Sequence, residues 1–182
     1  MNLSNFIEKY KVPSSVCDDL ISYFKKNKEY KSPGYTLVDK ESKNYKNSTD
    51  VTFMNSSKDK TIVGFFKHLN KSIQEYSNKY YLYDSVRTAQ LNNIQYYKPK
   101  EGYPGLHYER SYTTPHRQLV YMMYLNTITD EGGTRFVYQN ITLSAIKGDL
   151  YIWPADFTHL HQGVISSTQE KYIVTGWFEI SR

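Results

Sequence analysis

The amino-acid sequence predicts an α+β fold, mainly β, with two N-terminal helices packed on one sheet of a jelly-roll core. Three observations predict it. Apolar residues of the first 85 positions recur at helical spacing. After residue 86, short runs rich in Tyr, Val, Ile and Thr alternate with turn residues. Residues 118–125 and 171–178 are apolar on both alternating faces, so these strands need cover on both sides, which the helices can supply.

Length and composition favour one domain that spans residues 1–182. A chain of 182 residues with 39% hydrophobic content can fill a single core. We expect residues 1–85 to form a helical and irregular N-terminal support and residues 86–182 to form the β core. The apolar segments are short, and the N-terminus has neither the basic nor the apolar region of a signal peptide. We therefore expect a soluble, cytoplasmic protein without a membrane partner.

The formal charge of +5 comes largely from lysines scattered through the first hundred residues. Such a scattered excess is usually a solvated face, because a groove for nucleic acid would need the lysines to converge on one surface. We therefore do not expect a nucleic-acid partner. The single cysteine, Cys17, lies among apolar residues and is interpreted as a buried structural thiol.

The first predicted helix follows Pro13, and its apolar stripe has helical spacing: Val16, Leu20, Ile21 and Phe24. Asp18 and Asp19 are assigned to its first turn, where they favour the positive end of the helix dipole. The second helix runs from residue 61 to about residue 80, with Asp59 as its cap. Between the helices, residues 25–57 are polar and predict irregular structure, with a turn at Pro33-Gly34 and a weak strand candidate at 50–54.

The second half of the chain is predicted to form strands joined by hairpin-like turns, for example at residues 130–133 and 147–149. The expected strands are 88–97, 105–109, 118–126, 134–138, 143–146, 150–153, 159–165 and 171–180. Two packed antiparallel sheets, closed or nearly closed, accommodate this pattern.

Metal-binding residue types stand on two of these strands. His107 and Glu109 are two residues apart, and on a strand such positions project from the same face, so both can reach one metal ion. His161 or His159 can supply a third ligand, which leaves the other positions of the ion open for substrates. An isolated His-x-Glu pair is more often a solvated strand edge. His68 and His116 are interpreted as surface or packing residues, although His116 retains a possible substrate-binding role.

With the C-terminal stretch included, residues 88–178 resemble the 2-oxoglutarate and iron(II)-dependent oxygenases, specifically the prolyl 4-hydroxylase-like branch. That family has an early Tyr, a His-x-Asp/Glu pair, a distal His and, about ten residues later, a Lys. Tyr97, His107, Glu109, His161 and Lys171 match this order, and the interval to Lys171 selects His161 over His159. Further matches are Arg117-Gln118-Leu119, Tyr124-Leu125-Asn126, Glu131-Gly132-Gly133-Thr134, Gly148-Asp149-Leu150 and Trp153-Pro154.

The resemblance implies a double-stranded β-helix, cupin-like core and a role for each matched residue. His107, Glu109 and His161 would hold Fe(II) as the catalytic metal. His159 would not bind the metal but would support the ligands or pack beside them. Lys171 would bind the far carboxylate of 2-oxoglutarate, and Tyr97 or Thr175 would add a neutral hydrogen bond to it. Glu109 stands where many members have Asp, and its side chain is one methylene longer.

The resemblance also implies the chemistry. A dioxygenase of this kind uses O2 and 2-oxoglutarate, releases succinate and CO2, and hydroxylates its substrate, with ascorbate as a candidate reductant. A peptide or protein substrate is the first choice, with proline as the hydroxylated residue. Free amino acids, other small molecules and nucleobases are alternatives on the same scaffold. Residues 30–57 and 98–104 are candidate loops that select the substrate.

A second hypothesis comes from a different class of protein. A jelly-roll module without catalytic activity could bind carbohydrate, protein or nucleic acid, with the histidines structural or around a structural metal. The basic, Tyr-rich composition is compatible with such a module.

Overall fold

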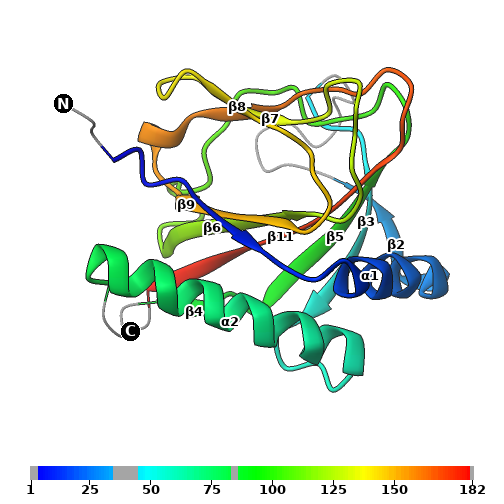
Figure 1. Ribbon diagram of the computed structural model, residues 1–182, viewed down its shortest axis with the longest axis horizontal. Coiled ribbons are helices and arrows are strands. Elements are labelled where there is room, and N and C mark those ends of the chain that lie inside the picture. Colours follow the sequence, from blue (N-terminus) through cyan, green and yellow to red (C-terminus); the bar gives the residue numbers. More distant parts are fainter. Residues whose placement is uncertain (1–3, 35–44, 83–85, 181–182) are drawn as a thin grey trace.

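A computed structural model describes residues 4–34, 45–82 and 86–180, and consists of two antiparallel sheets with two helices on the outer face of the larger sheet (Figure 1). The predicted mainly β, double-stranded β-helix fold is confirmed. Among the described residues, no helix has the length and apolar character needed to span a membrane.

The larger sheet has the strand order β1-β9-β6-β11-β5-β3-β2, and β4 pairs with the far end of β11. These strands are β1 (Glu8–Lys11), β2 (Lys31–Pro33), β3 (Thr49–Met54), β4 (Val86–Thr88), β5 (Leu91–Tyr97), β6 (Arg117–Tyr124), β9 (Asp149–Pro154) and β11 (Lys171–Ile180). The smaller sheet has the order β10-β7-β8, formed by β7 (Thr134–Phe136), β8 (Ile141–Leu143) and β10 (His161–Gly163). The two sheets face each other and enclose the functional site described below.

The central strand β6 explains why the sequence is apolar on both alternating faces. Leu119, Tyr121 and Met123 belong to the core cluster beneath the helices, whereas Val120, Met122 and Tyr124 belong to a second cluster that includes residues of the smaller sheet. Successive side chains of a strand point to opposite faces, so each face of β6 contributes to a different core. The prediction that helices cover one of these faces is therefore confirmed.

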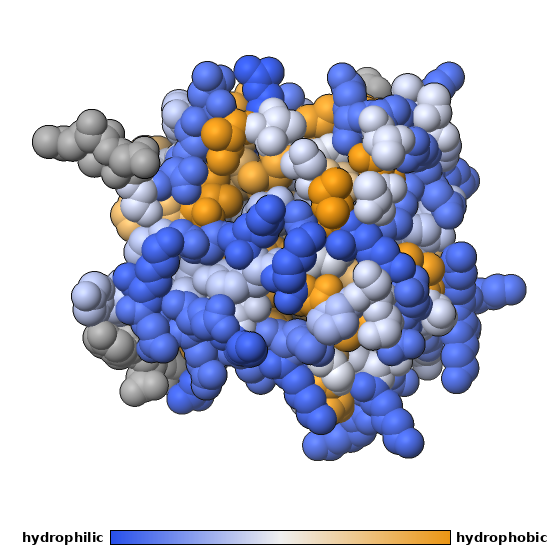
Figure 2. Space-filling view, viewed as in Figure 1, coloured by the Kyte–Doolittle hydropathy of each residue, from blue (hydrophilic) through white to orange (hydrophobic). Residues whose placement is uncertain are grey.

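Both predicted helices are confirmed, as α1 (Ser14–Lys26) and α2 (Lys60–Tyr80). Their outer surfaces are mostly hydrophilic, whereas hydrophobic residues are visible between the two sheets (Figure 2). Asp59 caps α2 as predicted, because its carboxylate accepts a hydrogen bond from the Thr61 amide. The placement of Asp18 and Asp19 in the first turn of α1 is wrong, since the helix begins at Ser14 and its first turn contains no acidic residue. Asp18 instead forms an ion pair with Lys147.

The N-terminal half contributes more strands than its sequence suggests. The weak strand candidate at 50–54 is β3, but β1 and β2 were not predicted, and these two strands lie at the two ends of the strand order of the larger sheet. The predicted turn at Pro33-Gly34 lies at the end of β2, where the Gly34 amide donates to the Ser48 carbonyl. Part of the candidate loop 30–57, residues 35–44, lies outside the described residues. The assignment of residues 1–182 to one domain stays a prediction.

The expected strand at 105–109 is wrong. His107 forms only an isolated β-bridge with His161, and the amides of Glu109 and Arg110 both donate to the Ala155 carbonyl. Two consecutive amides directed at one acceptor interrupt the regular ladder as in a β-bulge, and no regular pairing continues on either side of the single bridge. The bridge nevertheless fixes His107 next to the first residue of β10.

Candidate metal centre

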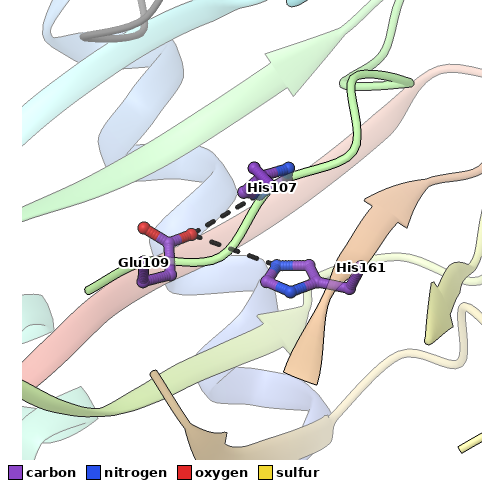
Figure 3. Close-up of side chains that lie close together, drawn as sticks. All are labelled: His107, Glu109 and His161. Carbon is purple, nitrogen blue, oxygen red and sulfur yellow. Dashed lines mark ion pairs between the residues drawn. The ribbon is translucent and has the colours of Figure 1, made fainter. Parts of the chain in front are cut away.

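His107, Glu109 and His161 converge between the two sheets, although His161 comes from a segment far along the chain from the other two (Figure 3). The Nε2 atoms of His107 and His161 lie 3.5 and 4.0 Å from Glu109 Oε1. All three candidate ligand atoms lie within 4.8 Å of one another. The backbone holds them there, because His107 and His161 exchange both of their amide-to-carbonyl hydrogen bonds at 2.9 Å.

Backbone carbonyls orient the two imidazole rings. Nδ1 of His107 lies 2.8 Å from the Gly105 carbonyl oxygen, and Nδ1 of His161 lies 2.8 Å from the His159 carbonyl oxygen. A carbonyl can only accept, so Nδ1 of each ring carries a hydrogen, and Nε2 is the ring atom that is turned toward Glu109. Burial lowers the pKa of His161 to about 3, and the charge of His107 contributes to the same shift. His161 is therefore neutral near pH 7, as a metal ligand must be.

The two oxygens of Glu109 have different partners. Oε1 faces the histidines, whereas Oε2 accepts hydrogen bonds from Trp177 Nε1 at 3.0 Å and from Arg117 at 3.1 Å. The Arg117 guanidinium also stacks on the Trp177 ring, 3.5 Å from its centroid. Burial alone would raise the pKa of Glu109, but the hydrogen bond with His107 and the charges of His107 and Arg117 outweigh burial and lower this pKa to about 2. The carboxylate is therefore ionised and presents one oxygen to the histidines.

This donor set fits a divalent transition metal. Two neutral imidazoles and one ionised carboxylate are the ligands of non-haem Fe(II) sites with open positions. Metal–ligand bonds of about 2 Å place neighbouring ligand atoms roughly 3 Å apart, so the observed separations require only small side-chain movements. The side chain of Tyr103 stacks on His107 with ring centroids 3.8 Å apart and supports that ring from the other side.

The remaining histidines lie elsewhere. Nε2 of His159 is 2.8 Å from the Asn5 carbonyl oxygen and its Nδ1 is 3.0 Å from the Thr158 hydroxyl, so the buried ring contacts the N-terminal segment. Its backbone carbonyl, however, orients His161. His116 is exposed and His68 is half-buried on α2.

Lys171 is a buried cation in the same cavity as the three candidate ligands. The residue is 5% exposed, and its Nζ donates to the carbonyls of Gly132 at 3.0 Å and Val164 at 3.2 Å. Burial lowers the pKa of Lys171 to about 8. Among the described residues, no carboxylate lies within ion-pair distance of it. Because buried cations are normally paired, this cavity suits an anionic ligand.

Tyr97 and Thr175 also line the cavity, but other groups already engage their hydroxyls. The Tyr97 hydroxyl donates to Gln95 Oε1 at 2.7 Å, while its ring lies 5.0 Å from Lys171 Nζ. The Thr175 hydroxyl donates to the Tyr121 carbonyl at 3.0 Å. Both residues are therefore beside the candidate anion site, and each would have to rotate its hydroxyl to reach a ligand.

The cavity has a volume of about 380 Å³, and besides the candidate metal ligands, Lys171 and Trp177 it is lined by residues of β3 and β5. This volume is within the range of small-molecule sites. On these two strands the lining includes the neutral residues Thr52, Leu91, Asn93 and Gln95 and the ion-paired Asp50. A second molecule could therefore lie beside a ligand held by Lys171.

Several polar residues of the cavity were not singled out from the sequence. Lys46 and Asp50 form a buried ion pair at 3.0 Å, and Gln95 joins Asp50 to Tyr97. Trp177 was only part of the predicted strand 171–180, and Arg117 was only part of a motif. The signal that could have found Trp177 is its position six residues after Lys171 on the same strand, which places it on the inward face with Ile173 and Thr175.

Comparisons with known proteins agree with the geometry. The model of the 2OG-Fe(II) oxygenase superfamily matches residues 90–179, which include all of the candidate ligands and Lys171. No match was found among curated protein sequences.

Solved structures share the fold over almost the whole chain. A viral collagen prolyl hydroxylase from Paramecium Bursaria Chlorella virus-1, in complex with 2-oxoglutarate, is 20% identical, covers 97% of each chain and has a TM-score of 0.72. A prolyl-4-hydroxylase from Pseudomonas putida is 14% identical over 98% of this chain and 95% of that chain, with a TM-score of 0.74. A prolyl hydroxylase from Trichoplax adhaerens, in complex with a hypoxia inducible factor peptide fragment, is 13% identical over 97% and 84%, with a TM-score of 0.76.

Proposed function

The chain belongs to the 2OG-Fe(II) oxygenase superfamily, and we propose that this dioxygenase hydroxylates a peptidyl residue, with proline as the first choice. Its cofactor is Fe(II) and its cosubstrates are 2-oxoglutarate and O2, with succinate and CO2 as products. Family membership argues against the alternative of a module without catalytic activity. The observation that carries the proposal is that buried Lys171, which has no carboxylate partner among the described residues, shares one cavity with the His107, Glu109 and His161 cluster.

Each of these residues is proposed to have one role. His107, Glu109 and His161 hold Fe(II), which supplies the oxidising chemistry once O2 and 2-oxoglutarate are present. Lys171 binds the far carboxylate of 2-oxoglutarate through a charge-assisted hydrogen bond, which is strong because the site is buried. Tyr97 and Thr175 add neutral hydrogen bonds after their hydroxyls rotate. His159 fixes His161 through its backbone carbonyl.

The lining of the cavity by β3 and β5 supports a peptide as substrate. Thr52, Asn93 and Gln95 carry neutral hydroxyl and amide groups, which suit the carbonyls and amides of an extended peptide. The Trichoplax adhaerens prolyl hydroxylase with a bound peptide fragment has the same fold. Free amino acids, other small molecules and nucleobases remain alternatives for the substrate. The described parts of loops 30–57 and 98–104 include cavity residues Ser32, Pro33 and Tyr103, in agreement with a role in substrate choice.

The proposal is tested by incubating the purified protein with Fe(II), 2-oxoglutarate and a library that contains proline peptides, free amino acids and nucleobases. We expect a mass gain of one oxygen atom on a peptide and stoichiometric succinate. His107→Ala, His161→Ala and Lys171→Ala must each abolish both products. Oxidation of a free amino acid instead of a peptide would contradict the peptide assignment, and 2-oxoglutarate binding that survives in Lys171→Ala would contradict the cosubstrate site. Ascorbate dependence can be measured in the same assay. The cytoplasmic location stays a prediction.

A further inference from the structure

Two separate loops supply the carbonyls that hold the ammonium group of Lys171. The Gly132 carbonyl belongs to the loop between β6 and β7, and the Val164 carbonyl belongs to the loop between β10 and β11. The three hydrogens of an ammonium group allow three hydrogen bonds. Two of them are used by these carbonyls, so one remains for an anionic ligand, and its direction depends on where both carbonyls lie.

Asp130 joins these two loops. Its Oδ1 accepts a hydrogen bond from the Ser166 hydroxyl at 2.6 Å. Its Oδ2 accepts from the Thr168 amide at 2.8 Å, from the Thr168 hydroxyl at 2.7 Å and from the Ser167 hydroxyl at 3.2 Å. These hydrogen bonds, with Ser166 and Thr168 contributing most, hold the pKa of Asp130 below its usual range. One carboxylate therefore ties the loop that contains Val164 to the loop that contains Gly132.

The loop of Asp130 needs such a tie because its backbone is strained. Glu131 and Gly132 follow Asp130 with φ angles of +74° and +69°, and a positive φ is unfavourable for a residue with a side chain such as Glu131. A side chain at Gly133 would meet the Leu143 carbonyl oxygen, so the loop also runs tightly against β8. Strained backbone persists only where its surroundings determine it, and Asp130 provides contacts directly before the strained pair.

Two further connections join the loops. The Val164 amide donates a hydrogen bond to the Gly133 carbonyl at 2.8 Å, directly beside both carbonyl positions, so Asp130 acts together with this backbone hydrogen bond. The Gln169 side chain exchanges hydrogen bonds with Thr129, at 3.1 Å to the Thr129 amide and 2.6 Å to its hydroxyl. Gln169 therefore supports the same pairing of loops one residue further from Gly132. Its presence predicts that the loops stay folded when Asp130 is replaced, with their relative position less well determined.

We propose that Asp130 is a positioning residue for 2-oxoglutarate, acting through the Gly132 and Val164 carbonyls on the direction of the Lys171 ammonium group. This inference rests on the proposed role of Lys171. Asp130 does not line the cavity itself, so its effect is confined to the cosubstrate and leaves the metal ligands unchanged. A role in stability alone would lower the melting temperature without changing the affinity for 2-oxoglutarate.

The test compares Asp130→Ala, Asp130→Asn and the double variant Asp130→Ala/Gln169→Ala with the unmodified protein. Isothermal titration calorimetry measures the dissociation constant for 2-oxoglutarate on protein loaded with Mn(II), and a separate titration measures the dissociation constant for Mn(II). Asp59→Ala is the matched control, because it removes an exposed aspartate that caps α2 and lies away from the cavity. It loses stability for a reason unrelated to the loops.

We expect Asp130→Ala to weaken the binding of 2-oxoglutarate roughly tenfold, in both its dissociation constant and its Michaelis constant, since a small misplacement of a binding group has an effect of about this order. Mn(II) affinity and kcat at saturating 2-oxoglutarate stay within about twofold of the unmodified values, because the metal ligands do not contact Asp130. Asp130→Asn retains one acceptor oxygen, so its affinity for 2-oxoglutarate falls between those of the unmodified protein and Asp130→Ala. The double variant binds 2-oxoglutarate more weakly than Asp130→Ala. Asp59→Ala lowers only the melting temperature.

An affinity for 2-oxoglutarate that is unchanged in folded Asp130→Ala overturns the inference, and so does an equal loss of Mn(II) affinity. Lys171→Ala separates this failure from that of the proposed function. If Lys171→Ala abolishes 2-oxoglutarate binding while Asp130→Ala has no effect, only the role of Asp130 is wrong. If Lys171→Ala also has no effect, the cosubstrate site itself is wrong.

Discussion

Two parts of the cavity wall differ in how their charge is balanced. Around Glu109 the balance is complete, since its carboxylate pairs with Arg117 and the neighbouring His161 is neutral. Around Lys171 it is not, because backbone carbonyls surround the ammonium group and no described carboxylate pairs with it. The first region is organised before any ligand binds. The second region carries an electrostatic cost that an anionic ligand removes.

Glu109→Gln is expected to have the largest effect, because it removes the only negative charge among the three candidate ligands. Metal affinity should fall by at least roughly 100-fold, since loss of a ligand exceeds the loss caused by its supporting partners. The variant also leaves Arg117 without its ion-pair partner, which costs about 2 kcal/mol of stability. Titration with Mn(II) and thermal melting measure the two effects. Glu75→Gln, on the exposed face of α2, is the control, and similar metal affinity in both variants would exclude Glu109 as a ligand.

Lys171→Met changes the region around the lysine, and we expect it to raise the stability of the protein, whereas Glu109→Gln lowers it. The two side chains have similar length, so the apolar replacement fills the same space without a buried charge. We expect the ligand-free protein to become more stable by about 1 kcal/mol. The affinity for 2-oxoglutarate should fall roughly 100-fold, as expected for loss of a charged hydrogen bond in a buried site. Calorimetry and thermal melting without ligand measure both changes. A less stable ligand-free variant would show that burial of the Lys171 charge does not destabilise the ligand-free protein.

The same two regions show what could be predicted from sequence. His107, Glu109, His161 and Lys171 were singled out because motif spacing depends on chain order, and the structure brings them into one cavity. The partners of Glu109 could not be derived in this way. The direction of Oε2 toward Trp177 depends on the register between β11 and β6, which the sequence does not specify. The Tyr97 hydroxyl could not be placed for a similar reason, because Gln95 engages it through a buried network that begins at Lys46.

The elements of the fold also separate into those that their own sequence predicts and those that depend on pairing with distant segments. The helices and β6 were predictable, since their apolar spacing is a local property of the segments themselves. Strand β1 has the sequence Glu-Lys-Tyr-Lys, in which only Tyr10 packs against the core, so pairing with β9 rather than composition makes it a strand. The segment at 105–109 shows the converse, because its composition suits a strand while its amides converge on Ala155.

Arg117→Ala tests whether the arginine orients the Glu109 carboxylate and keeps it ionised. Loss of the guanidinium removes a positive charge from Oε2, so the pKa of Glu109 rises and protons compete with the metal at higher pH. We expect metal affinity to fall roughly tenfold, the usual effect of losing a partner of a ligand. Arg117→Lys keeps the charge but loses the stacking on Trp177, and should retain most of the affinity. Equal affinity in Arg117→Ala and the unmodified protein would leave Trp177 as the residue that orients Glu109.

The smallest expected effect is a pH dependence, caused by Lys171, of the stability of the ligand-free protein and of its affinity for 2-oxoglutarate. The pKa of Lys171 is about 8 in the folded protein and near its ordinary value of 10.5 when unfolded, so the unfolded chain binds more protons between these values. The stability of the ligand-free protein should therefore gain from this group as pH rises from about 8 toward 10.5. Binding of 2-oxoglutarate has the opposite dependence, because it requires the protonated ammonium group. Its affinity should fall roughly threefold between about pH 7.5 and about pH 8.5, and Lys171→Met should show neither trend. A pH-independent affinity in calorimetry across this interval would mean that the ammonium group keeps its proton, and that the carbonyls of Gly132 and Val164 offset its burial.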